Sequence, residues 1–270
     1  MQYDPIKRKL GSLFGNTTAS RKLFYFMLDV LLLRSWHVRR MLRSLSPLLP
    51  ADAQVLDAGA GFGQYSWRMA RRNKGWNITA IDLKEEQVAD CNAFFSAVQL
   101  GDRVRFAVGD LTTLRHQQAY NLIISVDVME HIEQDGLVFR NFYSALKPGG
   151  VLIISTPSDK GGSDVHDHDD KSFIDEHVRD GYNREALTQT LLETGFARVD
   201  AAYTYGAPGS AAWRLSMKYP VKLLGISGIF WLVLPFYYLL VMPLVLLLNS
   251  LDVTGRHTSG TGLIVKAVKE

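Results

Sequence analysis

The sequence predicts a doubly wound α/β fold built on a mostly parallel, seven-stranded sheet. From residue 52 onward, short runs of β-branched residues alternate with stretches of helix length. The first of these runs leads into a turn with three glycines, Gly59, Gly61 and Gly63. An acidic residue follows or ends each of the first four runs, which is typical of a sheet edge that binds ligands.

The expected elements follow one another in this alternating order. The helices are expected at residues 63–74, 84–98 and 137–147, with a further helix that Asn183 caps and that ends before Gly195. The turn at residues 147–150 is expected to end a helix directly before a strand. The strands are expected at residues 54–57, 78–82, 104–108, 122–126, 151–156, 197–204 and 262–268.

Composition limits the possible classes of protein. The 270 residues are enough for one large domain, or for one domain with an insertion. Thirty basic side chains against 27 acidic ones give a net charge of +3, which is too balanced to predict nucleic-acid binding, and we expect none. The single cysteine, Cys91, excludes an internal disulfide and fits a reducing compartment.

Charge and hydrophobicity are unevenly distributed, which predicts four segments. Residues 1–48 carry nine Lys/Arg against two Asp/Glu and are expected to form basic amphipathic helices, either capping the core or touching a membrane surface. A cleaved signal peptide is not expected there. The catalytic core is expected at residues 49–205, a hydrophobic membrane-associating insertion at 206–258, and the last core strand at 259–270.

The glycine turn has a spacing that bears on its ligand. Glycine permits a tight turn and lets a ligand approach the backbone closely. The spacing is G-x-G-x-G, and Gln64 stands where the dinucleotide fingerprint requires its last glycine, which disfavours a nicotinamide dinucleotide. Asp57, directly before the turn, suits a ligand that carries a positive group.

Four acids are expected at the carboxyl edge of the sheet. Besides Asp57, Asp82 ends the second strand, where a carboxylate accepts hydrogen bonds from both ribose hydroxyls. Asp110 follows the third strand, within reach of an adenine amino group, and Asp127 follows the fourth. Aspartate is also common at strand-to-loop junctions for structural reasons alone, but four such acids beside a glycine turn favour a nucleoside site.

With these motifs in place, the chain resembles the class I S-adenosylmethionine-dependent methyltransferases, which have a Rossmann-like fold. The resemblance rests on VLDAGAGFG, AID, GDL, DVMEHIE and LKPGGVLIIS. It implies that the protein is an enzyme that transfers a methyl group from S-adenosylmethionine, its cofactor, to a small-molecule acceptor. It also implies that the following residues bind the cofactor: Asp57, Gly59, Gly61 and Gly63 (methionine part), Asp82 with Leu83 (ribose), Asp110 with Leu111 (adenine), and Asp127 (near the methyl group).

Methyl transfer to a hydroxyl group requires a base. His131 is the favoured candidate, because it lies just past the fourth strand beside Glu130, which could orient it. In the O-methyltransferases that the chain resembles, including those of ubiquinone biosynthesis, a Glu-His pair occupies this place. The alternative is that His131 only makes a structural hydrogen bond at the start of a helix.

The loop at residues 164–170 concentrates titratable side chains, with three more at 175–177. Its residue types suit a divalent metal, but its spacing matches no known signature, so no metal ligand is assigned. The loop is expected to act as an active-site lid, with His166, His168 or His177 as alternative bases. The run at residues 177–182 resembles a segment that precedes the last helix in some small-molecule methyltransferases, which implies that Arg179 and Tyr182 face the substrate pocket.

Residues 223–251 contain no charged side chain, and 22 of these 29 residues are apolar. A single membrane crossing would separate the last strand from its partner, and two crossings require about 40 residues. We therefore expect monotopic association with the cytoplasmic membrane, with a buried helical insertion or a dimer contact, or a true span, as alternatives. Pro235 and Pro243 are expected to kink or break a helix here.

In the family that the chain resembles, insertions between the last two strands commonly lie near the acceptor pocket. The resemblance therefore implies a small lipophilic or membrane-resident acceptor, which we expect to be methylated on oxygen. The basic N-terminal arm is expected to face the same membrane surface. Two other functions stay open at this point: a nicotinamide-dependent oxidoreductase, and a non-catalytic, membrane-recruited adapter that binds a nucleoside.

Overall fold

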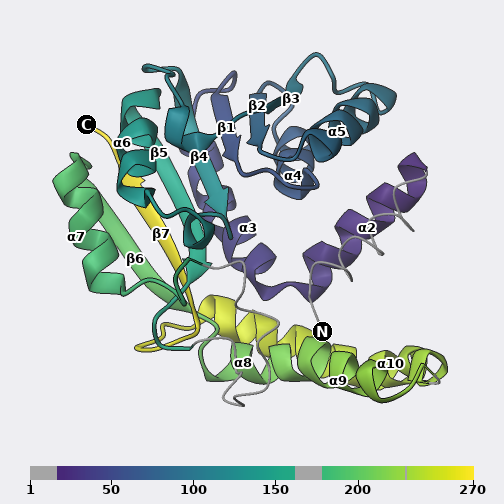
Figure 1. Ribbon diagram of the computed structural model, residues 1–270. Coiled ribbons are helices and arrows are strands. Elements are labelled where there is room, and N and C mark those ends of the chain that lie inside the picture. Colours follow the sequence, from purple (N-terminus) through teal and green to yellow (C-terminus); the bar gives the residue numbers. More distant parts are fainter. Residues whose placement is uncertain (1–16, 162–177, 229) are drawn as a thin grey trace.

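Seven strands form one sheet in the order β3-β2-β1-β4-β5-β7-β6 (Figure 1). The computed structural model describes residues 17–161, 178–228 and 230–270. The first five strands in this order, β3, β2, β1, β4 and β5, are parallel to one another. Strand β7 is antiparallel to both of its neighbours, β5 and β6. The strands are β1 (Gln54–Ala58), β2 (Asn77–Asp82), β3 (Val104–Val108), β4 (Tyr120–Val126), β5 (Leu146–Pro157), β6 (Arg198–Thr204) and β7 (Gly262–Val268). The predicted fold class is confirmed.

The helices cover both faces of this sheet. Those of the described ranges are α2 (Thr18–Leu31), α3 (Leu33–Leu45), α4 (Gln64–Arg72), α5 (Glu85–Ala97), α6 (Asp135–Ala145), α7 (Arg184–Thr194), α8 (Ala207–Trp213), α9 (Tyr219–Ile226) and α10 (Phe230–Thr254). Asn183 caps α7 through a hydrogen bond from the Ala186 N–H, and Gly195 ends the helix in a left-handed conformation, as predicted.

One predicted element is wrong. Residues 147–150 were expected to form a turn before the fifth strand, but β5 already begins at Leu146. The last strand explains this difference, because Gly149 N–H donates to the Lys269 carbonyl (2.8 Å) and Lys269 N–H donates to the Gly150 carbonyl (3.0 Å). Pairing with the end of β7 therefore extends the strand back through the glycines.

The sheet separates two hydrophobic cores. Val55 and Leu56, neighbours in β1, belong to different cores because successive side chains of a strand point to opposite faces. Helices α2 to α5 supply one core, and α6 and α7 supply the other.

The N-terminal helices pack against the core. Phe24 and Tyr25 of α2 are buried, as are six residues of α3. The Thr17 side chain and Ser20 form a capping box that starts α2. Leu23 and Phe26 are exposed on the other side of α2. Capping of the core by these helices is therefore present in the structure.

A hydrophobic helical insertion joins β6 to β7, as predicted. Helices α9 and α10 extend away from the sheet at one end of the molecule (Figure 1). Helix α10 is 25 residues long, contains both Pro235 and Pro243, and is not broken at either. Tyr237 and Tyr238 brace it by donating hydrogen bonds to the carbonyls of Leu215 and Ser216 (2.7 and 2.8 Å).

Helix α10 differs from an ordinary core helix in its exposure. It is long and apolar enough to cross a membrane, with a mean hydropathy of 2.3 over its most apolar 18 residues, yet only 11% of that window is buried in the protein. Its exposed side chains include Trp231, Leu232, Phe236, Leu239, Leu240 and Leu247.

Candidate active site

The glycine turn connects β1 to α4 at the carboxyl edge of the sheet. Gly59, Gly61 and Gly63 all have positive φ angles (77°, 51° and 78°), which explains why glycine is required at each. A Cβ atom at Gly59 would lie 2.3 Å from a methyl carbon of Val128, whereas at Gly61 nothing lies within 4 Å. The backbone at Gly61 therefore opens into space in which a ligand could lie against the turn.

Asp57 lies beneath this turn, with only 2% of its surface exposed. Its Oδ2 accepts a hydrogen bond from the Ser66 hydroxyl (2.7 Å), which ties β1 to the first turns of α4. Burial raises the pKa of Asp57 to about 6, and the charge of Asp82 adds to this effect. The carboxylate thus supports the turn from below, while the resemblance implied direct contact with a ligand.

Asp82 and Asp110 lie at the ends of β2 and β3. The Asp82 carboxylate accepts hydrogen bonds from the N–H groups of Gly61 (2.7 Å) and Lys84 (3.0 Å), so it also holds the glycine turn. Asp110 is exposed and accepts a hydrogen bond from Thr112 N–H (2.8 Å). Beside it, Leu111 is buried.

Two apolar side chains are exposed at this same edge. Leu83, after β2, is 69% exposed, and Val108, the last residue of β3, is 54% exposed. Exposed apolar side chains at the ends of two adjacent strands provide a surface on which a flat, partly apolar group could pack.

Asp127 follows β4 in a left-handed conformation, with a φ of 52°. Its N–H donates to the Ser155 carbonyl (2.8 Å), and its carboxylate forms an ion pair with Arg34 of α3. The Arg34 N–H in turn donates to the hydroxyl of Tyr205 (3.0 Å), at the end of β6. Arg34 therefore links helix α3 both to Asp127, after the fourth strand, and to Tyr205, at the start of the insertion.

Glu130 and His131 follow in a short 3-10 helix, Met129–His131, and their side chains have opposite environments. Glu130 is 1% exposed and accepts a hydrogen bond from the Thr156 hydroxyl (3.0 Å). Burial and the neighbouring charge of Asp127 raise the pKa of Glu130 to about 8. His131 is exposed at the same edge of the sheet.

Residues 49–194, more than half of the chain, match the family described as "Methyltransferase domain". The chain belongs to the class I S-adenosylmethionine-dependent methyltransferase family. Its cofactor is S-adenosylmethionine. The comparisons support neither the nicotinamide-dependent oxidoreductase nor the non-catalytic adapter that the sequence left open.

Named relatives agree with this family. A ubiquinone biosynthesis O-methyltransferase from Xanthomonas axonopodis pv. citri is 39% identical over 111 residues, which cover 40% of this chain and 45% of the relative. A phosphoethanolamine N-methyltransferase from Triticum aestivum is 32% identical over 154 residues, covering 57% of this chain and 30% of the relative. The chain thus spans less than half the length of the curated relatives it matches.

One solved structure shares the fold of this methyltransferase over nearly all of the present chain. Phosphoethanolamine N-methyltransferase 2 of Haemonchus contortus, in complex with S-adenosyl-L-methionine, superposes with a TM-score of 0.63 at 18% identity. The match covers 97% of this chain and 59% of the other. At this identity the likeness establishes the fold alone.

The carboxyl edge of the methyltransferase fits S-adenosylmethionine. The open backbone at Gly61 suits a group that must approach the turn closely, and the exposed Leu83 and Val108 suit the flat face of an adenine ring. Asp82 and Asp110 supply carboxylate oxygens beside these two surfaces.

Helix α2 also holds the glycine turn of the methyltransferase, which the sequence pattern did not indicate. The Tyr25 hydroxyl (2.5 Å) and the Arg21 guanidinium (3.1 Å) both donate to the carbonyl of Phe62, inside the turn. Arg21 also forms an ion pair with Asp90. The basic residues at 21 and 34 were visible in the sequence, but only as parts of an amphipathic pattern.

Arg179 and Tyr182 fix the segment that carries Glu130 and His131. Arg179 pairs with Asp135 and donates to the Ile132 carbonyl (2.9 Å), and the Tyr182 hydroxyl donates to the Met129 carbonyl (3.0 Å). These contacts hold the protein's own backbone, so the expectation that both side chains face a substrate pocket is not supported by their hydrogen bonds. The loop at 164–170 and His177, named as a lid and as alternative bases, lie outside the described residues.

Proposed function

We propose that the protein transfers the methyl group of S-adenosylmethionine to an oxygen atom of a small, lipophilic acceptor that reaches the site from a membrane. The observation that carries this proposal is the long, apolar and mostly exposed helix α10, which is rooted beside the active-site edge. The ubiquinone biosynthesis O-methyltransferases among the relatives support an oxygen acceptor on an apolar molecule.

The proposed cofactor residues follow the edge of the sheet. The turn Gly59-Gly61-Gly63, supported by Asp57 from below, would hold the methionine part, and Asp127 would lie near the methyl group. The ribose would contact Asp82 and Leu83, and the adenine would contact Asp110 and Leu111. S-adenosylmethionine supplies an electrophilic methyl group on a sulfonium, so the protein has to align the acceptor and exclude water.

The proposed base is His131, because it is exposed at the edge while Glu130 is buried beside it. His131 would accept the proton that a hydroxyl acceptor loses during methyl transfer.

The root of α10 connects the apolar surface to the active-site edge. Asp252, near the end of α10, accepts a hydrogen bond from Tyr205 N–H (3.2 Å). The Tyr205 hydroxyl accepts from Arg34 N–H, and Arg34 pairs with Asp127. A membrane that contacts α10 would therefore lie next to the edge at which the methyl group is transferred.

We propose monotopic association with the cytoplasmic face of a membrane. Helix α10 carries a continuous series of exposed apolar side chains, whereas soluble proteins usually expose such side chains singly.

Flotation of the full-length protein with phosphatidylcholine vesicles tests this association. The double substitution Leu240→Glu/Leu247→Glu should abolish flotation, because it places two charges on the exposed face of α10. The control Leu48→Glu, at a residue 78% exposed on the opposite part of the fold, should leave flotation unchanged. Equal flotation of all three proteins would contradict membrane association through α10.

The acceptor is tested by incubating the protein with membrane extracts and S-adenosylmethionine that carries a deuterated methyl group. Mass spectrometry should show the label in an organic-phase product as a methyl ether or ester. Label found only in water-soluble products, or on nitrogen, would overturn the proposed acceptor class while leaving the methyltransferase activity in place.

A further inference from the structure

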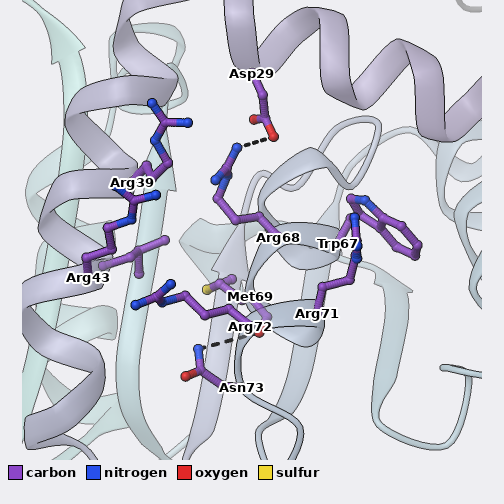
Figure 2. Close-up of a pocket in the computed structure, with 10 residues that line it drawn as sticks. Asp29, Arg39, Arg43, Trp67, Arg68, Met69, Arg71, Arg72 and Asn73 are labelled. Atoms are coloured by element: carbon purple, nitrogen blue, oxygen red, sulfur yellow. Dashed lines mark hydrogen bonds and ion pairs between the residues drawn. The ribbon is translucent and has the colours of Figure 1, made fainter. Parts of the chain in front are cut away.

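A cavity of about 370 Å³ lies between helices α3 and α4, and five of its ten lining residues are arginines (Figure 2). It lies along the outer side of α4 and is separate from the edge at which Asp82 and Asp110 lie. Among the described residues that line it, Asp29, near the end of α2, is the only one with an acidic side chain.

Four of the arginines form two facing pairs. Arg39 and Arg43 are one turn apart on α3, and Arg68 and Arg72 are one turn apart on α4. Figure 2 shows the guanidinium groups of both pairs directed into the space between the two helices. Two of the five arginines also stack on aromatic rings: Arg39 lies over the Trp36 ring at 4.7 Å, and the fifth arginine, Arg71, lies over the Trp67 ring at 5.3 Å.

The positive charge of this cavity is largely uncompensated by the protein. Asp29 pairs with Arg68 and also accepts a hydrogen bond from the Gln64 amide (2.8 Å). Within the described ranges, no ion pair neutralises Arg39, Arg43 or Arg72. The buried Nε of Arg68 has no hydrogen-bond partner in these ranges.

The mutual repulsion of these arginines favours an anionic ligand at this cluster. Burial lowers the pKa of Arg39, the charges of Arg68 and Arg43 lower it further, and the charge of Asp29 opposes them. Basic residues near the ends of α3 and α4 are also favoured by the helix dipoles. That effect accounts for Arg43, Arg71 and Arg72, while Arg39 and Arg68 lie nearer the middle of their helices, where Arg39 stacks over the Trp36 ring at 4.7 Å and Arg68 pairs with Asp29.

We propose that this cavity binds a phosphate-bearing anion with at least two negative charges. Planar guanidinium groups bind phosphate oxygens in pairs, and two facing pairs suit a diphosphate or a phosphomonoester. The volume of about 370 Å³ is sufficient for such a group. The same chemistry is offered by a soluble phosphate compound and by an anionic phospholipid headgroup.

Calorimetry of the full-length protein with inorganic pyrophosphate tests the soluble source. One site per chain is expected. The variant Arg43→Gln/Arg72→Gln removes two exposed arginines and should weaken binding about a hundredfold, roughly tenfold for each charged contact. The control Arg105→Gln/Arg140→Gln removes the same charge elsewhere, from exposed residues, and should bind like the parent protein.

Flotation with phosphatidylcholine vesicles, with and without phosphatidic acid, tests the lipid source. If the headgroup is the ligand, phosphatidic acid increases flotation of the parent and of the control variant, but not of Arg43→Gln/Arg72→Gln. The proposal is overturned if the two double variants lose binding equally in either experiment. It is also overturned if the parent protein responds neither to pyrophosphate nor to phosphatidic acid. Neither readout depends on methyl transfer, so its failure is separate from that of the proposed function.

Discussion

The Nε2 atom of His37, on helix α3, lies 2.8 Å from Oδ1 of Asp252, near the end of helix α10. Asp252 is completely buried, and its Oδ2 accepts a second hydrogen bond from Gly209 N–H (2.9 Å). Burial alone would raise the pKa of this carboxyl, but the hydrogen bond and charge of His37 outweigh it and lower the pKa. One ionised side chain thus attaches the apolar insertion to the body of the protein.

The variant Asp252→Ala should therefore loosen the insertion. It leaves the His37 imidazole and two backbone N–H groups buried without their acceptor, which should cost about 3 kcal/mol of unfolding free energy. Hydrogen exchange should show loss of protection over α10 before the sheet opens. The control Asp200→Ala removes a partly exposed acid that pairs with Lys266 and should cost less than about 1 kcal/mol. Equal costs for the two variants would show that Asp252 does not anchor α10.

The anchor also predicts a pH dependence. Because the folded-state pKa of Asp252 is lowered, its stabilising contribution is present above the unfolded-state pKa, near pH ~4, and is lost as the pH falls further. Thermal unfolding of the parent protein should therefore lose stability on acidification more steeply than that of Asp252→Ala.

The turn glycines allow a matched pair of substitutions. Gly61 and Gly149 both have positive φ angles (51° and 74°), and an added Cβ atom would meet nothing within 4 Å at either position. Alanine at either residue should cost about 1 kcal/mol of stability through backbone strain alone. Only at Gly61 does the added methyl group enter the proposed cofactor space.

Gly61→Ala should therefore weaken the binding of S-adenosylhomocysteine at least tenfold, while Gly149→Ala should leave it unchanged. Calorimetry measures both affinities, and thermal unfolding checks that the strain is equal. If Gly61→Ala bound the nucleoside as tightly as the parent, the glycine turn would not be the cofactor site.

The sheet could be predicted from the sequence because each strand has a recognisable pattern within its own few residues. Val104–Val108 and Gly262–Val268 are short β-branched runs bounded by turn residues, and the structure has strands over these same residues. The fifth strand begins five residues earlier than expected, at Leu146 instead of residue 151, because Lys269, which pairs with Gly149 and Gly150, is remote from them in sequence.

The parts of the site that were missed depend on contacts between distant segments. Arg34 meets Asp127 across 93 positions, and Tyr25 reaches the turn at Phe62. A basic, aromatic helix has the same periodicity whether it lies on a membrane or on a core, so the pattern could not tell which acid or carbonyl each side chain would meet. The opposite environments of Glu130 and His131 were equally hidden, because both residues lie in one short turn.

Glu130 predicts a dependence of stability on pH with the opposite sign to that of Asp252. Its pKa is raised to about 8, whereas an unfolded chain releases this proton near pH ~4.3. Between these values the folded state binds more protons than the unfolded state, so stability falls as the pH rises. Glu130→Gln removes this loss and retains an acceptor for the Thr156 hydroxyl.

The melting temperature of Glu130→Gln, relative to the parent, should therefore increase steadily from pH ~5 to pH ~8. The exposed neighbour Glu133 provides the control, because Glu133→Gln should show a difference that does not change with pH. Parallel curves for Glu130→Gln and the parent would mean that Glu130 is ionised in the folded protein.

His131 is the residue on which the chemical step of the proposed function depends. His131→Ala should lower kcat about a hundredfold or more with a hydroxyl acceptor, because it removes the base, and should leave the affinity for S-adenosylhomocysteine unchanged. The acidic limb of the pH–rate profile, which reports protonation of the base, should disappear as well. Glu133→Ala, two residues on and also exposed, should retain both kcat and the profile. Normal turnover in His131→Ala would assign proton removal to another group, and a loss of cofactor affinity would make His131 a structural residue of the edge.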